Sequence, residues 1–268
     1  MKINAPDWAH FFVLNGIMYV RGEFMIRIIW VYLNAFLYII FHLFKIRKHY
    51  KFPERFSHEE RFSIVKKTAM LVAKRSGCPV HVLGKENLLD EPVLYVANHP
   101  SMMDPYFCGV GIENPTGAVI AGDEGYENIP IIAPWLRSIG SVFIDRENPR
   151  QALKGINKGV QNVKRGHSLL LFPEGEITRY VDPNVKVAPF QTGGLKIATK
   201  AKVPIIPIAI SGTEKVYPRR SVLGPIRKHP VTIRFLKPYT KHLESSITVR
   251  EMAEELRQLI TDNVDIEI

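Results

Sequence analysis

The chain has 268 residues, enough for one well-formed hydrophobic core or at most two small domains. Its formal net charge of +10 favours an anionic partner, such as nucleic acid, an anionic membrane face or a phosphorylated substrate, although a solvated basic surface gives the same balance. The two cysteines, Cys78 and Cys108, have no metal-ligand spacing. They argue against a disulfide scaffold and fit a reducing compartment.

The N-terminal region contains a long apolar segment. Residues 28–44 carry no formal charge over seventeen positions, just short of the roughly 20 apolar residues that span a bilayer. Charged residues separate it from an earlier apolar stretch at 11–20, and no signal-peptide cleavage site follows it. Basic residues at 45–51 suit the cytoplasmic side. We predict that residues 1–50 form a membrane-associated helical segment, lying in or partly through the bilayer. The alternative is a helix packed on the globular domain.

The rest of the chain alternates short apolar runs with helical patterns. Strands are predicted over residues 80–83, 93–97, 119–121, 141–144, 168–172, 203–210 and 231–236. Helices are predicted after the capping residues Ser57, Asn148 and Thr248, and over residues 193–201. Strands that alternate with helices indicate an α/β fold. We therefore predict that residues 51–268 form a single α/β domain with a central mixed sheet of about seven strands flanked by helices.

A histidine and an aspartate follow one of these strands. His99 lies in the turn after the strand at 93–97, and Asp104 stands where the next helix begins. An imidazole that takes a proton from an alcohol needs a carboxylate to hold one tautomer and to stabilise its charged form. The sites of α/β proteins lie at such carboxyl ends of strands. We predict that His99 is a general base and that Asp104 orients it.

Four motifs occur in order along the chain. They are Asn98-His-Pro-Ser-Met-Met-Asp104, Gly140-Ser-Val-Phe-Ile-Asp-Arg146, Phe172-Pro-Glu-Gly-Glu-Ile-Thr-Arg179 and Val203-Pro-Ile-Ile-Pro-Ile208. A histidine and an aspartate alone are a weak signal, whereas four motifs in this order and spacing are specific. Over residues 60–215 the chain resembles the glycerolipid acyltransferase family, through these motifs.

The resemblance implies a membrane-associated O-acyltransferase. His99 would activate the free hydroxyl of a lysophospholipid acceptor, most simply 1-acyl-sn-glycerol-3-phosphate, for attack on an acyl-CoA or acyl-carrier protein thioester. Arg146, Glu174, Gly175 and Arg179 would bind the acceptor and its phosphate, and backbone N–H groups around Glu174 and Gly175 are candidates for stabilising the oxyanion. We expect no metal site, because the histidines are scattered and no cluster of cysteine and histidine has ligand spacing. We expect no cofactor, because the acyl thioester is a co-substrate.

Several of these residues also have a structural interpretation. Arg146 could form a surface salt bridge, Glu174 could be an exposed turn carboxylate, and Asp104 could complement a helix dipole. Two departures from the family pattern concern the acceptor: Glu176 replaces a threonine, and residues 122–124 (Gly-Asp-Glu) stand where a lysine is common. The reaction class is therefore firmer than the acceptor, for which another lysolipid, a glycolipid or a lipoamino acid is the alternative.

Other functional classes are less consistent with the sequence. A hydrolase acting through Ser101 would need a Gly-x-Ser-x-Gly elbow, which the chain lacks. Nucleic-acid binding would need a recognition motif beyond basic residues, and a non-catalytic lipid-binding module would not need the His99 and Asp104 pair. The basic stretch at 215–237 contains seven lysines and arginines and no acid. It suits anionic lipid headgroups or an acidic acyl-carrier protein.

Overall fold

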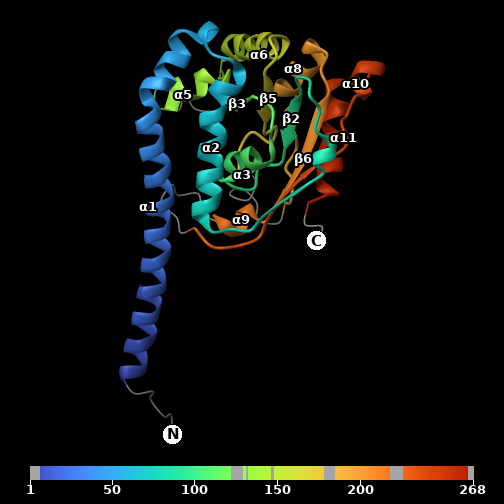
Figure 1. Cartoon of the computed structure of the whole chain (residues 1–268). Coiled ribbons are helices and arrows are strands. Elements are labelled where there is room, and N and C mark those ends of the chain that lie inside the picture. The colour runs from blue at the N-terminus through green and yellow to red at the C-terminus, as the bar shows by residue number, and fades with distance from the viewer. Residues whose placement is uncertain are drawn as a thin grey trace.

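In the computed structural model, seven strands form one sheet that is covered by helices on both faces (Figure 1). The structure describes the backbone of residues 7–121, 129–130, 132–145, 148–177, 185–217 and 226–264, and the side chains of the first helix from Ile29 onward. The strands are β1 (Val80–Leu83), β2 (Leu94–Ala97), β3 (Thr116–Ala121), β4 (Val142–Ile144), β5 (Ser168–Leu171), β6 (Ile205–Ser211) and β7 (Val231–Phe235). Their order is β1-β7-β6-β2-β5-β3-β4. Among these described strands, β6 and β7 pair antiparallel and the other neighbours pair parallel, so the sheet is mixed, as predicted.

Several of the helices begin at capping residues that are recognisable in the sequence. They are α1 (Asp7–Lys51), α2 (His58–Ser76), α3 (Asp104–Gly111), α5 (Ile132–Ser138), α6 (Pro149–Lys164), α8 (Thr192–Ala201), α9 (Thr213–Val216), α10 (Lys241–Glu244) and α11 (Val249–Thr261). The side chains of Ser57, Asn148 and Thr248 accept hydrogen bonds from backbone amides at the starts of α2, α6 and α11, which confirms these three predicted helices. Helices α5, α9 and α10 are too short to show a helical period in the sequence.

Strand β2 lies inside the sheet and contributes to a hydrophobic core on each face. Tyr95 and Ala97 belong to the core that includes residues of α2 and α3. Leu94 and Val96 belong to the core that includes residues of α6, α8 and α11. All four side chains are fully buried, because alternate residues of a strand point to opposite faces. The carboxyl end of β2 is therefore held from both sides.

Helix α1 is one continuous helix of 45 residues, about 68 Å long. One side of it packs on the domain, where Val31, Ala35 and Ile46 are buried. Another side exposes large apolar side chains, namely Ile29, Trp30, Leu33, Phe36, Leu37, Ile40, Phe41 and Phe44. The segment Ile29–Lys51 is long and apolar enough to cross a membrane by length and composition. The structure thus combines both interpretations of this helix, since it packs on the domain and still exposes an apolar stripe.

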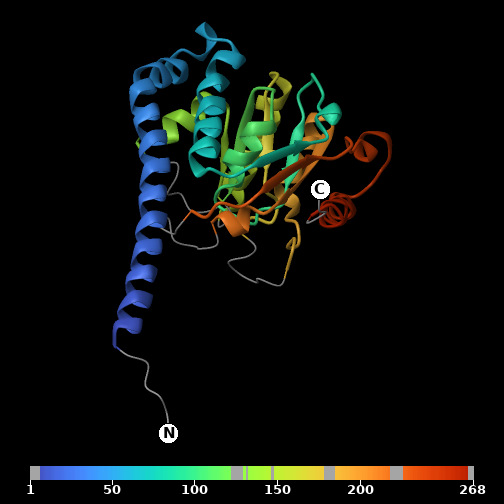
Figure 2. The ribbon, with the colours of Figure 1, turned by 60° about the horizontal axis from the view of Figure 1, so that its bottom comes forward.

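The N-terminal half of α1 projects beyond the rest of the molecule. Figure 1 and Figure 2 both show it extending on the side where α9 lies. Helix α9 directly follows β6, whose carboxyl end therefore faces the same side. Because β2 and β6 are parallel, the carboxyl end of β2 and the residues that follow it also face this side.

Candidate active site

Two adjacent parallel strands, β2 and β5, bring the first and third motifs together. His99 follows β2 and Phe172 follows β5. Asn98 directly follows β2, and its buried side chain hydrogen-bonds to the backbone of Ile210 on the neighbouring strand β6. The side-chain amide donates to the Ile210 carbonyl at 2.9 Å, and the side-chain oxygen accepts the Ile210 N–H at 2.8 Å. These two hydrogen bonds fix the chain immediately before His99.

His99 and Asp104 form a hydrogen-bonded pair, as the sequence predicts. The distance between His99 Nδ1 and Asp104 Oδ2 is 2.7 Å. Asp104 is the first residue of α3 and is fully buried, and its Oδ2 also accepts the Ser101 N–H at 2.8 Å. A carboxylate at Nδ1 holds the proton on that nitrogen and leaves Nε2 with a free lone pair. The pair therefore has the geometry of a general base with its orienting residue.

Burial raises the pKa of the Asp104 carboxyl. The hydrogen bond and charge of His99 oppose this increase, and the neighbouring Thr213 hydroxyl and the Ser101 amide lower the pKa further. The second oxygen, Oδ1, and the Thr213 hydroxyl form no well-aligned hydrogen bond within the described part of the chain. Asp104 thus depends chiefly on His99 to compensate for the loss of water around its charge.

The imidazole of His99 is held on one face and open at its edge. Its ring stacks on Phe172 with the centroids 4.2 Å apart and the planes inclined by 23°. The His99 side chain is 18% exposed, and no described residue hydrogen-bonds to its Nε2. The nitrogen that would take a proton is therefore the one that Asp104 leaves free.

Glu174 is not an exposed turn carboxylate, because it is 5% exposed and bonded to the backbone of two other segments. One oxygen accepts the His99 N–H at 2.6 Å and the other accepts the Ala188 N–H at 2.9 Å. Burial raises the pKa of Glu174 to about 7, although these two amide donors oppose the increase. Both oxygens are engaged with backbone, so the geometry supports a positioning role. The resemblance implies that Glu174 contacts the acceptor directly. Glu174 would have to make that contact in addition to its two bonds with the backbone.

Gly175 allows the turn that follows Glu174. Its φ of +85° lies in the left-handed region, which side chains rarely adopt. Its N–H donates to the Phe172 carbonyl at 3.2 Å. The Gly175 amide is therefore engaged in this conformation, and an oxyanion donor among the backbone N–H groups around Glu174 and Gly175 stays a prediction.

Two predicted site residues, Arg146 and Arg179, lie outside the described residues, as do residues 122–124. The strand that precedes Arg146 is β4, at one edge of the sheet and parallel to β2 through β3 and β5. Glu176, at the position of the threonine in the family pattern, is exposed.

Asn98, Phe172 and Thr213 also contribute to this site, although no role was predicted for them from the sequence. Asn98 and Phe172 lie within the motifs, directly after buried strands, and this position was the available signal. Thr213 follows β6 and reaches Asp104 only through the order of the strands, so no local pattern indicates it.

Comparisons with known proteins agree with this arrangement. The family model described as Acyltransferase matches residues 79–211. A 1-acyl-sn-glycerol-3-phosphate acyltransferase of Saccharomyces cerevisiae is 29% identical over 189 residues, which cover 70% of this chain and 60% of the relative. A probable 1-acyl-sn-glycerol-3-phosphate acyltransferase of Mycoplasma pneumoniae is 32% identical over 181 residues, which cover 66% of each. The chain thus spans slightly less than two thirds of these relatives.

The crystal structure of the 1-acyl-sn-glycerophosphate acyltransferase PlsC from Thermotoga maritima has the same fold. Its TM-score is 0.71 at 22% identity, and the match covers 91% of this chain and 98% of that one. The matched family model contains the strands that carry His99 and Glu174. The match to the PlsC structure shows the shared fold, and the family model and the curated relatives show that this chain belongs to the glycerolipid acyltransferase family.

Proposed function

We propose that the chain transfers a fatty acyl group from a thioester to the free hydroxyl of a lysophospholipid, and that the acceptor is 1-acyl-sn-glycerol-3-phosphate, giving phosphatidate. The observation that carries the proposal is the contact of 2.7 Å between His99 Nδ1 and Asp104 Oδ2 at the carboxyl end of β2. The names of the curated relatives support this acceptor.

The reaction follows from the orientation of His99. Nε2 takes the proton of the acceptor hydroxyl while the hydroxyl oxygen attacks the thioester carbonyl. Asp104 stabilises the imidazolium that forms, because its carboxylate accepts the Nδ1–H bond. When the tetrahedral intermediate collapses, the carbon–sulfur bond breaks and His99 returns the proton to the leaving thiolate. General-base catalysis of this kind contributes about 10²–10⁴ in rate.

We further propose that the protein acts at a membrane, with its site at the cytoplasmic face. The exposed apolar stripe of α1 supports membrane association. The projection of α1 on the side of the β2 carboxyl end would direct His99 toward the bilayer, where a lysophospholipid resides (Figure 1). The basic residues at 45–51 favour the cytoplasmic side.

The donor in this proposal is acyl-CoA or an acyl-carrier protein, and it is a co-substrate. The proposed chemistry needs no bound cofactor and no metal, because His99 moves the only proton and the thioester supplies the activated acyl group. We expect no nucleic acid among the partners.

Acyl transfer by the purified protein tests the proposal. Oleoyl-CoA and oleoyl-carrier protein would each be offered with lysophosphatidate and, separately, with other lysolipids. We expect transfer to lysophosphatidate that His99→Ala abolishes and that His81→Ala, a change at an exposed histidine on β1, preserves. Transfer to a different lysolipid only would replace the acceptor. Transfer that survives in His99→Ala would contradict the mechanism.

A further inference from the structure

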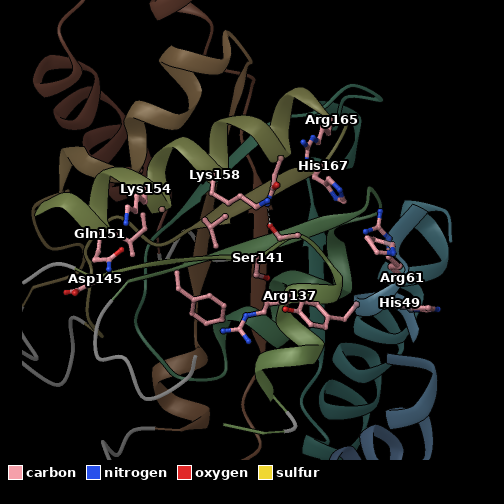
Figure 3. A pocket seen from close by; sticks show the side chains of 18 residues that line it. His49, Arg61, Arg137, Ser141, Asp145, Gln151, Lys154, Lys158, Arg165 and His167 are labelled. Atoms are coloured by element: carbon pink, nitrogen blue, oxygen red, sulfur yellow. Dashed lines mark hydrogen bonds between the residues drawn. The ribbon is translucent and has the colours of Figure 1, made fainter. Parts of the chain in front are cut away.

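A large groove runs along β4, at the opposite side of the sheet from β1, with a volume of about 700 Å³. In Figure 3, Lys154 and Lys158 of α6 line one side and Arg137 lies across from them. One end of the groove contains Asp145. At the other end lies a basic cluster, which we define as His49, Arg61, Arg165 and His167.

The basic cluster contains a buried cation, Arg61. Arg61 is only 7% exposed, and among the described residues no carboxylate forms a salt bridge with it. Within the described residues, its guanidinium makes a single hydrogen bond, a long contact of 3.4 Å from Nε to the Ser57 carbonyl. A buried guanidinium normally has a carboxylate or phosphate partner, because burial removes the water that solvates its charge. Arg61 therefore has donors available for an anion.

The histidines of the cluster point to the same conclusion. His49 is fully buried, and neither of its ring nitrogens has a hydrogen-bond partner within the described residues. His167 stacks on His58 with the ring centroids 3.7 Å apart. Burial lowers the pKa of His167 to about 4, and the charges of His58, Arg61 and Arg165 lower it as well. Both histidines are therefore uncharged near neutral pH and can donate an N–H to an anion, while Arg61 and Arg165 supply the positive charge of the cluster.

Helix α6 extends this positive charge along the groove. Lys154, Lys158 and Arg165 are exposed on α6 or just after it. The two lysines form no salt bridge with any described residue. Lys154 and Arg165 are separated by about 16 Å along the helix axis. An elongated ligand that carries phosphates at two separate positions matches this distribution better than a single small anion.

The end of the groove that contains Asp145 lies at the carboxyl ends of the strands, as the active site does. Asp145 follows the carboxyl end of β4, and His99 follows the carboxyl end of β2. Strands β3 and β5 lie between β4 and β2 in the sheet. Three strand spacings amount to about 14 Å. The pantetheine arm of coenzyme A in an extended conformation can cover such a distance.

We propose that the groove along β4 binds the phosphate groups of a coenzyme A thioester, with the terminal phosphate at the buried basic cluster and the pyrophosphate along Lys154 and Lys158. This assignment rests on the acyl transfer proposed above and selects one of its two donor classes. The acidic side chains of a folded carrier protein reach exposed lysines, but they do not reach a buried arginine.

Donor analogues and groove variants test the assignment. Initial rates would be measured with oleoyl-CoA, with oleoyl-3′-dephospho-CoA and with oleoyl-N-acetylcysteamine, which has no phosphate. In Lys154→Ala/Lys158→Ala we expect KM for oleoyl-CoA to rise at least about tenfold with kcat retained, because uniform binding is lost. KM for the phosphate-free donor should stay unchanged. Arg61→Gln should remove the preference for oleoyl-CoA over its 3′-dephospho form.

The matched control is Lys196→Ala/Lys200→Ala, which removes two exposed lysines with the same spacing from α8, outside the groove. Equal KM changes in the control and the groove variant would overturn the assignment.

Calorimetric titration with desulfo-CoA, which cannot react, separates the two proposals. Binding that depends on Lys154 and Lys158 without any acyl transfer would support the groove and refute the proposed function. Transfer from all three donors with equal KM would refute the groove alone. Inorganic phosphate or anionic lipid vesicles that bind the groove as tightly as desulfo-CoA would also refute the donor assignment.

Discussion

The carboxylate of Glu174 accepts a hydrogen bond from the backbone N–H of His99 at 2.6 Å, across 75 positions of sequence. With its other oxygen it holds Ala188 at 2.9 Å, so one buried side chain links three segments. The position of the imidazole therefore depends on a residue that does not touch its ring.

Replacing this carboxylate should lower kcat. In Glu174→Gln one amide N–H replaces an acceptor oxygen and faces a backbone donor, so one of the two bonds is lost. We expect kcat to fall about 10- to 100-fold, because displacing a catalytic group by even 1 Å has effects of this size. Steady-state kinetics would measure it. The exposed neighbour provides the control: Glu176→Gln should leave kcat within twofold, and an equal loss in both variants would contradict the positioning role.

The same residue predicts a pH dependence of stability. Its folded-state pKa of about 7 lies above the ordinary value of 4.5, so between these pH values the folded protein holds a proton that the unfolded chain has released. The stabilising contribution is therefore present below about pH 4.5 and is lost as the pH rises through about 7, at no more than about 1.4 kcal/mol per pH unit. Urea unfolding at pH 5 and pH 8 measures it. The stability of the wild type relative to Glu174→Gln should be greater at pH 5, and an equal difference at both pH values would refute the prediction.

The catalytic pair should respond to two separate changes. His99→Ala removes the general base, and Asp104→Asn keeps the shape of the orienting side chain but removes its charge. Each should reduce kcat by about 10²–10⁴. The double variant should lose little more than either single one, because the two residues act as a unit. Losses that multiply in the double variant would show that Asp104 does not act through His99.

Asn98 should contribute chiefly to stability. Asn98→Ala leaves the buried N–H and carbonyl of Ile210 without partners, which should lower the free energy of unfolding by about 2–4 kcal/mol. Chemical denaturation would measure the change. The exposed Asn157 on α6 is the comparison, since Asn157→Ala should cost less than about 0.5 kcal/mol. Similar losses in the two variants would mean that the Asn98 bonds contribute nothing net.

The apolar stripe of α1 should determine membrane binding. Phe41 is 84% exposed and Phe44 is 72% exposed, and each would bury its ring in lipid. In Phe41→Ser/Phe44→Ser we expect at least about a tenfold weaker partition into vesicles in a flotation assay. Leu153→Ser/Leu259→Ser changes two exposed leucines on α6 and α11 and should partition like the wild type. Undiminished binding of the phenylalanine variant would exclude this stripe as the contact.

The elements of the fold were predictable wherever their signals are local. The strand at 93–97 is a buried apolar run, and Ser57, Asn148 and Thr248 mark helix starts through their own hydrogen bonds. The order of the strands was not predictable, because it depends on packing between distant segments. That β2 lies between β5 and β6 follows from no feature of residues 93–97 alone.

The same distinction applies to the site. His99 and Asp104 are only five residues apart, so a strand followed by a helix is enough to bring them together. The bonds of Glu174 need β2 and β5 to be neighbours, and the sequence therefore predicted the residue without its contacts. The groove along β4 was not predicted, since its lining combines β4 with residues of α1, α2, α5 and α6, which are distant in the sequence.

Helix α1 packs on α2 over its C-terminal half and continues without a break into the half that projects beyond the sheet (Figure 1). A straight helix that is clamped at one end behaves as a rigid lever, so a tilt of the projecting half is transmitted to the whole sheet. The depth of the helix in a bilayer would thus set the height of His99 above the lipid surface. Because the apolar stripe lies on the same C-terminal half that packs on α2, residues added to the projecting half would lengthen the helix but leave that height unchanged.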